Sequence, residues 1–128
     1  MILDTSVVMA FAFNESAASW LSQKMAREHL GGLHMSWVNI AEAGMTYRRQ
    51  SPSLPDAVEP ILSRLGVVAL DLDQATIRLA VEARSRFPLN FGDCFAYAHA
   101  KLRNEALITL DADFLKTDLA TVIHPSRG

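Results

Sequence analysis

Short apolar runs recur along the chain, each about the length of a β-strand. They contain few polar residues, which is typical of strands covered on both faces of a parallel sheet. Glycines precede two of these runs and indicate turns. The predicted strands are residues 1–3, 33–36, 67–72, 106–110 and 121–123.

The segments between these runs carry apolar residues three and four positions apart, which predicts helices. Ser16 is the expected N-cap of the first of them, another begins near Ser36, and Pro60 is expected to kink or restart its helix. The predicted apolar stripes are Ala17, Trp20, Leu21 and Met25; Val38, Ala41 and Met45; Val58, Ile61, Leu62 and Leu65; Ile77, Ala80 and Val81; and Phe95, Ala98 and Leu102.

Strands that alternate with helices pair in parallel, so the predicted fold class is α/β, a three-layer α/β/α sandwich with a mostly parallel sheet. The chain has 128 residues, of which half are hydrophobic. This is enough for one buried core, and we expect one domain over residues 1–128. The best linker candidate, residues 51–55, is too short to separate two domains.

Composition indicates a cytoplasmic protein. The single cysteine, Cys94, cannot form an internal disulfide and fits a reducing compartment. We expect no signal peptide and no membrane association, because no window approaches the roughly 20 apolar residues of a membrane span. The net charge is −2 and the pI is near 6.0. An RNA partner would therefore require bound metal or a local basic patch to offset the acidic residues.

Two carboxylates follow predicted strands. Asp4 ends the first apolar run and Asp111 ends the fourth. The carboxyl ends of parallel strands meet at one edge of a sheet, where ligands bind. Each acid also has an ordinary structural interpretation. Asp4 fits a turn residue, with Thr5-Ser6 capping the next helix. Asp111 fits the N-cap of a short helix that has Asp113 in its first turn.

Two further carboxylates lie on predicted helices. Asp93 follows Asn90, a candidate N-cap, and begins a helix so apolar that Asp93 is expected to face the sheet. Glu42 lies on the flank of its helix's apolar stripe, with no Lys or Arg one turn away. A first-turn Asp and a solvated Glu are common. A buried, unpaired carboxylate, however, must be protonated, hydrogen-bonded or bound to metal.

These four acids can converge on one edge of the sheet. A pocket with a charge of about −4 requires cations. Oxygen ligands favour Mg²⁺, or Mn²⁺, and the chain has no His/Cys spacing suited to zinc. The converging acids are Asp4, Glu42, Asp93 and Asp111.

Four segments resemble, in order, the blocks of PIN-domain ribonucleases of the VapC toxin family. The opening ILDTSVVMAFAFNE resembles the start of these domains, and WVNIAEAG the helix with a catalytic Glu. LNFGDCFAYAHAK resembles the segment with the third acid, and LITLDADFLKTDL the fourth block. Each motif is weak, but the ordered set spans nearly the whole chain and is specific.

The last block departs from the family pattern. Many relatives have a glycine where Asp111 stands and acids at the next two positions, which here are Ala112 and Asp113. The resemblance therefore leaves open whether Asp111 or Asp113 is the fourth acid.

The resemblance implies a Mg²⁺-dependent endoribonuclease that is the toxin of a type II toxin–antitoxin pair. It implies that Asp4 and Asp93 hold the metal, and that Glu42 with Asp111 or Asp113 completes the catalytic site. Bound metal would polarise the scissile phosphate and activate a water. The implied partners are structured RNA, with transfer RNA as the leading candidate, a VapB-type antitoxin and a second copy of the chain in a homodimer.

A second class of function is a degenerate PIN scaffold that binds RNA or a protein partner without cleaving. The presence of all four acids favours the nuclease, and a Mg²⁺ titration by calorimetry would separate the two. Other enzyme classes lack their motifs. There is no GxxxxGK[ST], GxGxxG or G-x-S-x-G segment.

The remaining side chains with functional chemistry are expected to be structural or peripheral. The histidines are scattered and are predicted to be surface or packing residues, Cys94 to be a core residue, and the tryptophans to be core or interface residues. The candidates for contacts to RNA phosphate are Arg48, Arg49 and Lys101.

Overall fold

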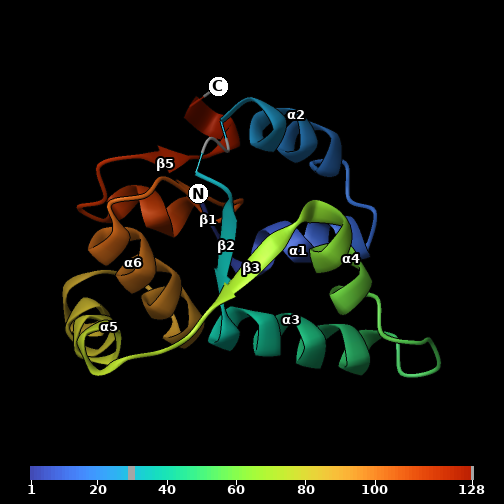
Figure 1. Cartoon of the computed structure of the whole chain (residues 1–128), viewed down its shortest axis with the longest axis horizontal. Helices are drawn as coiled ribbons and strands as arrows, with labels where there is room; N and C mark the ends of the chain where they lie inside the picture. The colour runs from blue at the N-terminus through green and yellow to red at the C-terminus, as the bar shows by residue number, and fades with distance from the viewer. Residues whose placement is uncertain (29–30, 128) are drawn as a thin grey trace.

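The computed structural model describes residues 1–28 and 31–127. Its described strands form one parallel sheet in the order β3-β2-β1-β4-β5 (Figure 1). The predicted parallel α/β fold is therefore confirmed. The strands are β1 Ile2–Leu3, β2 Leu33–Ser36, β3 Val67–Leu70, β4 Leu107–Ile108 and β5 Val122–Ile123.

Helices cover both faces of the sheet, which confirms the three-layer α/β/α sandwich. Helices α5 and α6 lie on one face, and α1 to α4 pack against the other (Figure 1). The helices are α1 Thr5–Ala12, α2 Ala18–Glu28, α3 Trp37–Gln50, α4 Val58–Leu65, α5 Gln74–Arg86 and α6 Phe91–Arg103, with 3₁₀ turns η1 Ala112–Lys116 and η2 Pro125–Arg127. None of the described helices is long and apolar enough to cross a membrane.

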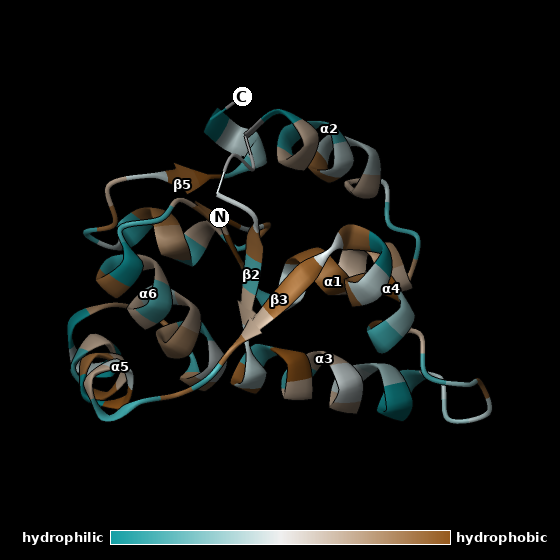
Figure 2. Ribbon diagram, viewed as in Figure 1, coloured by the Kyte–Doolittle hydropathy of each residue, from teal (hydrophilic) through white to brown (hydrophobic). Residues whose placement is uncertain are grey.

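Successive residues of a strand pack into different hydrophobic cores, one on each face of the sheet, because side chains alternate between the two faces. In β1, Ile2 packs with α5 and α6, whereas Leu3 packs with α1 to α4, and neither is exposed. Figure 2 shows the strands mostly in the hydrophobic colour. The edge strand β3 differs from the prediction, because its Val68 is 58% exposed. An edge strand is covered less completely than the central ones.

Several predicted boundaries shift by a few residues. Helix α2 begins at Ala18, two residues beyond the expected cap Ser16. Pro60 lies in the first turn of α4 and does not interrupt it. A first-turn N–H has no partner within the helix, so proline is tolerated there. The Asp56 carboxylate accepts hydrogen bonds from the Val58 and Glu59 N–H groups at 3.0 and 3.3 Å.

Two helices bury a different face from the predicted one. In α5, Ile77 and Val81 are 44% and 69% exposed. In α3, Met45 is 69% exposed and Ala41 is also exposed. Helix α3 turns Tyr47 inward instead, stacked on Phe13 with ring centroids 5.5 Å apart. The buried residues are Thr76, Ala80 and Ala83 in α5, and Asn39, Ala43 and Tyr47 in α3.

The strand order reverses at β1, with β2 and β3 on one side and β4 and β5 on the other. The adjacent carboxyl ends of β1 and β4 therefore form the topological switch point, where open α/β sheets bind ligands. Asp4 follows β1 there, and Thr109 follows β4.

Candidate active site

Asp4 is 2% exposed at the end of β1. The Ser6 hydroxyl donates to Oδ1 at 2.6 Å, and the Thr109 hydroxyl donates to Oδ2 at 2.7 Å. Burial raises the pKa of Asp4 to about 6, and the charge of Asp111 adds to this rise. The expected capping of α1 by Thr5-Ser6 is wrong, because neither side chain bonds to the start of that helix. Their hydroxyls bind carboxylates instead.

Asp93 lies in the first turn of α6 and is 8% exposed. Asn90 is the N-cap, as predicted, and its Oδ1 accepts the Asp93 N–H at 3.0 Å. Burial and then the charges of Asp4 and Asp111 raise the pKa of Asp93 to about 7. The charges of Asp4 and Asp111 therefore both reach Asp93. No described Lys or Arg forms an ion pair with any of them.

Asp111 and Asp113 have different surroundings in the structure. Asp111 caps η1, as predicted: its Oδ1 accepts the Asp113 N–H at 2.9 Å. Its own N–H donates to the Thr109 hydroxyl at 2.9 Å. The Asp113 side chain is 44% exposed and pairs with Lys116 at 3.4 Å. Of the two candidates for the fourth acid, the fold brings only Asp111 into electrostatic contact with Asp93.

Glu42 is half-buried on α3 and is not the solvated residue of the ordinary interpretation. Its Oε1 accepts hydrogen bonds from the Thr5 hydroxyl at 2.6 Å and from Asn39 Nδ2 at 3.0 Å. A methyl group on Gly92 would overlap the Glu42 carboxylate. The missing side chain therefore lets α6 approach α3 closely. Glu42 thus meets the residue next to Asp93.

Several polar residues of this site were not predicted from the sequence. Thr109 is fully buried and supports Asp4. A polar residue inside the apolar run 106–110 was the available signal. Asn39 is fully buried and lies one turn before Glu42. Its signal was weaker, because an Asn on a helix is usually solvated.

The donor set fits a hard divalent cation. In the described part of the chain, no three Asp, Glu, His or Cys side chains form a complete metal-binding group. Mg²⁺ often binds through one or two carboxylates and completes its shell with water and phosphate. Asp4 and Asp93 offer oxygen ligands only. Burial raises the pKa of each, and the negative charge of Asp111 adds to the rise.

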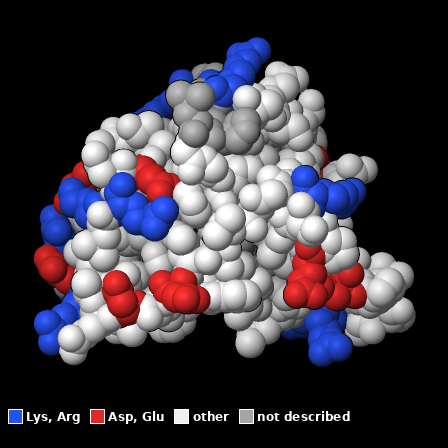
Figure 3. Space-filling view, in the orientation of Figure 1, with Lys and Arg blue, Asp and Glu red and all other residues white. Residues whose placement is uncertain are grey.

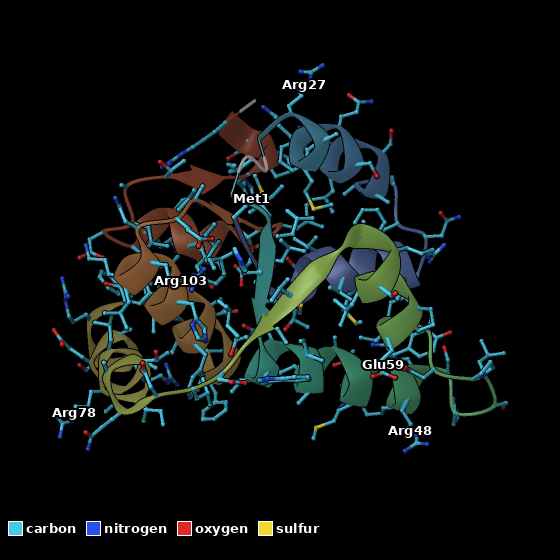
Figure 4. The ribbon with its side chains drawn as sticks, in the orientation of Figure 1. Met1, Arg27, Arg48, Glu59, Arg78 and Arg103 are labelled. Carbon is cyan, nitrogen blue, oxygen red and sulfur yellow. The ribbon has the colours of Figure 1, made fainter. Side chains whose placement is uncertain are left out.

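The candidate RNA-contacting residues lie away from this site. Lys101 pairs with Asp118 at 3.3 Å and stands about 12 Å beyond Asp93 along α6, at 1.5 Å per residue. Figure 4 shows Arg48 at the outer end of α3, on the opposite side of the molecule from α6. Figure 3 shows acidic and basic groups interspersed on one face without a continuous basic patch. These RNA contacts stay predictions.

The described histidines do not join the acids. His34 Nδ1 lies 3.0 Å from Glu105 Oε2, and His124 Nδ1 lies 2.8 Å from the Ser126 hydroxyl. His99 is buried, and burial lowers its pKa. These three match the predicted surface or packing roles. His29 lies outside the described residues.

Cys94 and Trp20 are packed as predicted, but Trp37 is not a core residue. Cys94 is 2% exposed, and burial raises the pKa of its thiol. Trp20 packs against the core beneath α1 to α4. Trp37 is 52% exposed, and its indole N–H donates to Asp71 at 2.8 Å.

A parallel α/β sheet with a group of carboxylates at its switch point defines a PIN-like protein with an acidic site. The chain matches the PIN domain family over residues 1–119. Ribonuclease VapC42 of Mycobacterium tuberculosis is 35% identical, over 93% of this chain and 96% of the relative. Ribonuclease VapC30 of the same organism is 30% identical, over 98% and 100%. The chain therefore belongs to the PIN-domain family, among the VapC ribonucleases.

Solved structures agree on the fold. VapC20 of Mycobacterium tuberculosis, described as a sarcin-ricin loop cleaving toxin, aligns with a TM-score of 0.74 at 18% identity. The alignment covers 95% of this chain and 98% of that one. DNA-bound VapBC from Salmonella typhimurium aligns with a TM-score of 0.71 at 18% identity, over 96% of each chain.

Proposed function

We propose that this protein is a Mg²⁺-dependent endoribonuclease and the toxin of a type II toxin–antitoxin pair. The observation that carries the proposal is the group of carboxylates at the switch point, where the buried Asp4 and Asp93 lie within electrostatic reach of Asp111. Membership of the VapC ribonucleases supports the activity.

In this proposal Asp4 and Asp93 hold the ion directly, with Mn²⁺ as a possible substitute. When bound, Mg²⁺ supplies the positive charge that polarises a phosphodiester and acidifies a water. The hydroxyls of Ser6 and Thr109 orient the Asp4 carboxylate. Asp111 adds negative charge beside Asp93 and strengthens the attraction for the cation.

Glu42 is the proposed general base. Its Oε1 already accepts two hydrogen bonds, from Thr5 and Asn39. Its Oε2 accepts none from the described residues and can take the proton of the attacking water. Asp111, not Asp113, is the proposed fourth acid, because Asp113 is paired with Lys116.

The proposed partners follow from family membership and from the acidic site. A VapB-type antitoxin would block the site, and an arginine that reaches the carboxylates would compete with the cation. The structural neighbour from Salmonella typhimurium is a VapBC complex, which supports an antitoxin partner. A homodimer is proposed from the family alone.

The proposed substrate is structured RNA cut in single-stranded loops, with transfer RNA as the leading candidate. The major groove of duplex RNA is deep and narrow, whereas loop nucleotides can bend toward a recessed site. With a net charge of −2, the chain should bind arbitrary RNA weakly and in a salt-sensitive way.

Digestion of total RNA tests this function. Wild-type protein with Mg²⁺ should create new ends at a few loop positions, and a folded Asp93→Asn variant should create none. New ends spread evenly over all transcripts, or lying mainly in perfect duplex, would contradict the proposed substrate. RNA binding without any new ends would identify a non-cleaving scaffold instead.

A further inference from the structure

The Asn39 side chain on α3 is fully buried and joins two parts of the site. Its Nδ2 donates one hydrogen bond to Glu42 Oε1 and one to the Gly92 carbonyl oxygen, each at 3.0 Å. Its Oδ1 is buried and accepts no hydrogen bond from the described residues. The amide nitrogen therefore serves two acceptors, while the amide oxygen receives no donor from the described part of the chain.

Stability alone does not explain this amide. A buried acceptor without a donor lowers stability, and an apolar side chain would avoid that cost. The orientation of the amide is also determined. Rotation by a half turn would place Oδ1 against the Glu42 carboxylate and the Gly92 carbonyl, which are both acceptors. The orientation of the Asn39 amide is therefore the one in which it donates to both Glu42 and Gly92.

Those groups belong to both halves of the candidate site. Glu42 Oε1 also accepts the Thr5 hydroxyl at 2.6 Å, so two donors converge on one carboxylate oxygen. Gly92 immediately precedes Asp93, and a side chain at Gly92 would displace the Glu42 carboxylate from its present position. Asn39 therefore connects Glu42 to the peptide that leads into Asp93.

We propose that Asn39 is a positioning residue for the nuclease reaction. Together with Thr5 it immobilises Oε1 of Glu42 and leaves Oε2 to act on the substrate or its water. Through the Gly92 carbonyl it sets the separation of Glu42 from Asp93. This inference rests on the proposed nuclease function and assigns a role to a residue that acts through Glu42 and the Gly92 peptide.

A double-mutant cycle tests whether Asn39 acts through Glu42. Asn39→Ala should lower kcat by about 10- to 100-fold, in line with the loss of a hydrogen bond to a charged group, with KM changed less than about twofold. In a Glu42→Gln background the same substitution should lower the residual kcat by less than about threefold. Equal fold-losses in both backgrounds, or an effect on KM alone, would overturn the inference.

A second measurement covers the case in which Asn39→Ala does not fold. Thr5→Val removes the other donor to Glu42 and should lower kcat, whereas Thr5→Ser keeps the hydroxyl and should restore most of it. Equal activity of these two variants would overturn the shared positioning role. Thr76→Val is the matched control, since Thr76 is a buried polar residue on α5 and its loss should leave kcat unchanged.

The same double-mutant cycle can also be measured by protein stability, which does not depend on catalysis. In urea unfolding without metal, Asn39→Ala should shift the midpoint less in the Glu42→Gln background than in the wild type. Equal midpoint shifts would overturn the direct coupling. A wild-type chain without nuclease activity would overturn the proposed function and this inference together. An active wild type with additive effects would overturn this inference alone.

Discussion

Asp4 carries its carboxylate where water solvates it poorly. Two hydroxyls stabilise the charge, but burial still raises the pKa to about 6. At neutral pH the ionised group therefore destabilises the metal-free fold. The same desolvation strengthens the attraction for a cation, because less water competes for the carboxylate. One feature thus lowers stability and favours metal binding.

The Asp4→Asn variant should separate these two effects. We expect loss of nuclease activity together with a gain of about 1–2 kcal/mol in the unfolding free energy of the metal-free protein, because one buried like charge disappears. Urea unfolding with a chelator at pH 8 measures the gain. Asp113→Asn is the control and should change neither property, because Asp113 is half-exposed beside Lys116. Loss of activity in the control would show that Asp113 belongs to the site.

Each of helices α5 and α6 begins with a side-chain cap. Asn90 Oδ1 accepts the Asp93 N–H at 3.0 Å at the start of α6, and Asp73 Oδ1 accepts the Thr76 N–H at 2.8 Å at the start of α5. The two caps are alike in geometry. Only the cap of α6 holds a residue of the candidate site, so the pair distinguishes a structural effect from a catalytic one.

Replacement of each cap by alanine should have different consequences. Asn90→Ala should lower the unfolding free energy by about 1 kcal/mol and also reduce kcat, because the first turn of α6 carries Asp93. Asp73→Ala should destabilise the chain without a change in kcat. Thermal unfolding and nuclease assays on both variants are the measurements. An equal loss of kcat would mean that destabilisation alone lowers activity.

The stability of the molecule should depend on pH through two carboxylates whose pKa values are raised and a histidine whose pKa is lowered. Asp4 and Asp93 have raised pKa values of about 6 and 7, so the folded state binds more protons than the unfolded state. Their contribution to stability is full below about pH 4 and is lost as the pH rises through 6 and 7. His99 has a lowered pKa, so its contribution is present above about pH 6.5 and is lost in acid.

Metal-free protein should therefore lose thermal stability between about pH 6.5 and 8, where Asp93 is the main group still losing its proton. Asp93→Asn should flatten this decline, and Mg²⁺ should oppose it in the wild type. Melting temperatures measured across this range, with a chelator and with Mg²⁺, test the expectation. The same slope in wild type and variant would show that another group is responsible.

The proposed toxin role is tested by measuring the growth of cells that express the chain. Wild-type chain expressed alone should arrest growth, and expression beside its antitoxin should restore growth. Asp93→Asn should be tolerated without antitoxin, because it removes a proposed metal ligand. Harmless accumulation of folded, wild-type chain alone would count heavily against the toxin role.

The architecture, and the placing of two acids at one edge of the sheet, could be predicted from the amino-acid pattern. Apolar runs between helical stripes are enough to indicate a parallel, helix-covered sheet, since strands and helices differ in the period of their buried residues. Parallel strands then bring their carboxyl ends to one edge, so the pattern alone predicts that Asp4 and Asp111 lie close together. The Asn90 cap and the burial of Asp93 followed from local pattern as well.

The buried helix faces and the contacts between polar groups could not be predicted from the sequence and depend on how the elements pack. Apolar spacing predicted Met45 and Val81 as buried, yet both are 69% exposed, because burial depends on what packs against a helix. The proposal of Asp111 over Asp113 rests on the Asp111 cap of η1 and on the pairing of Asp113 with Lys116. Asp4 and Thr109 are 105 positions apart, and Asn39 and Gly92 are 53 apart. No local pattern encodes such pairs, because folding alone brings them within hydrogen-bonding distance.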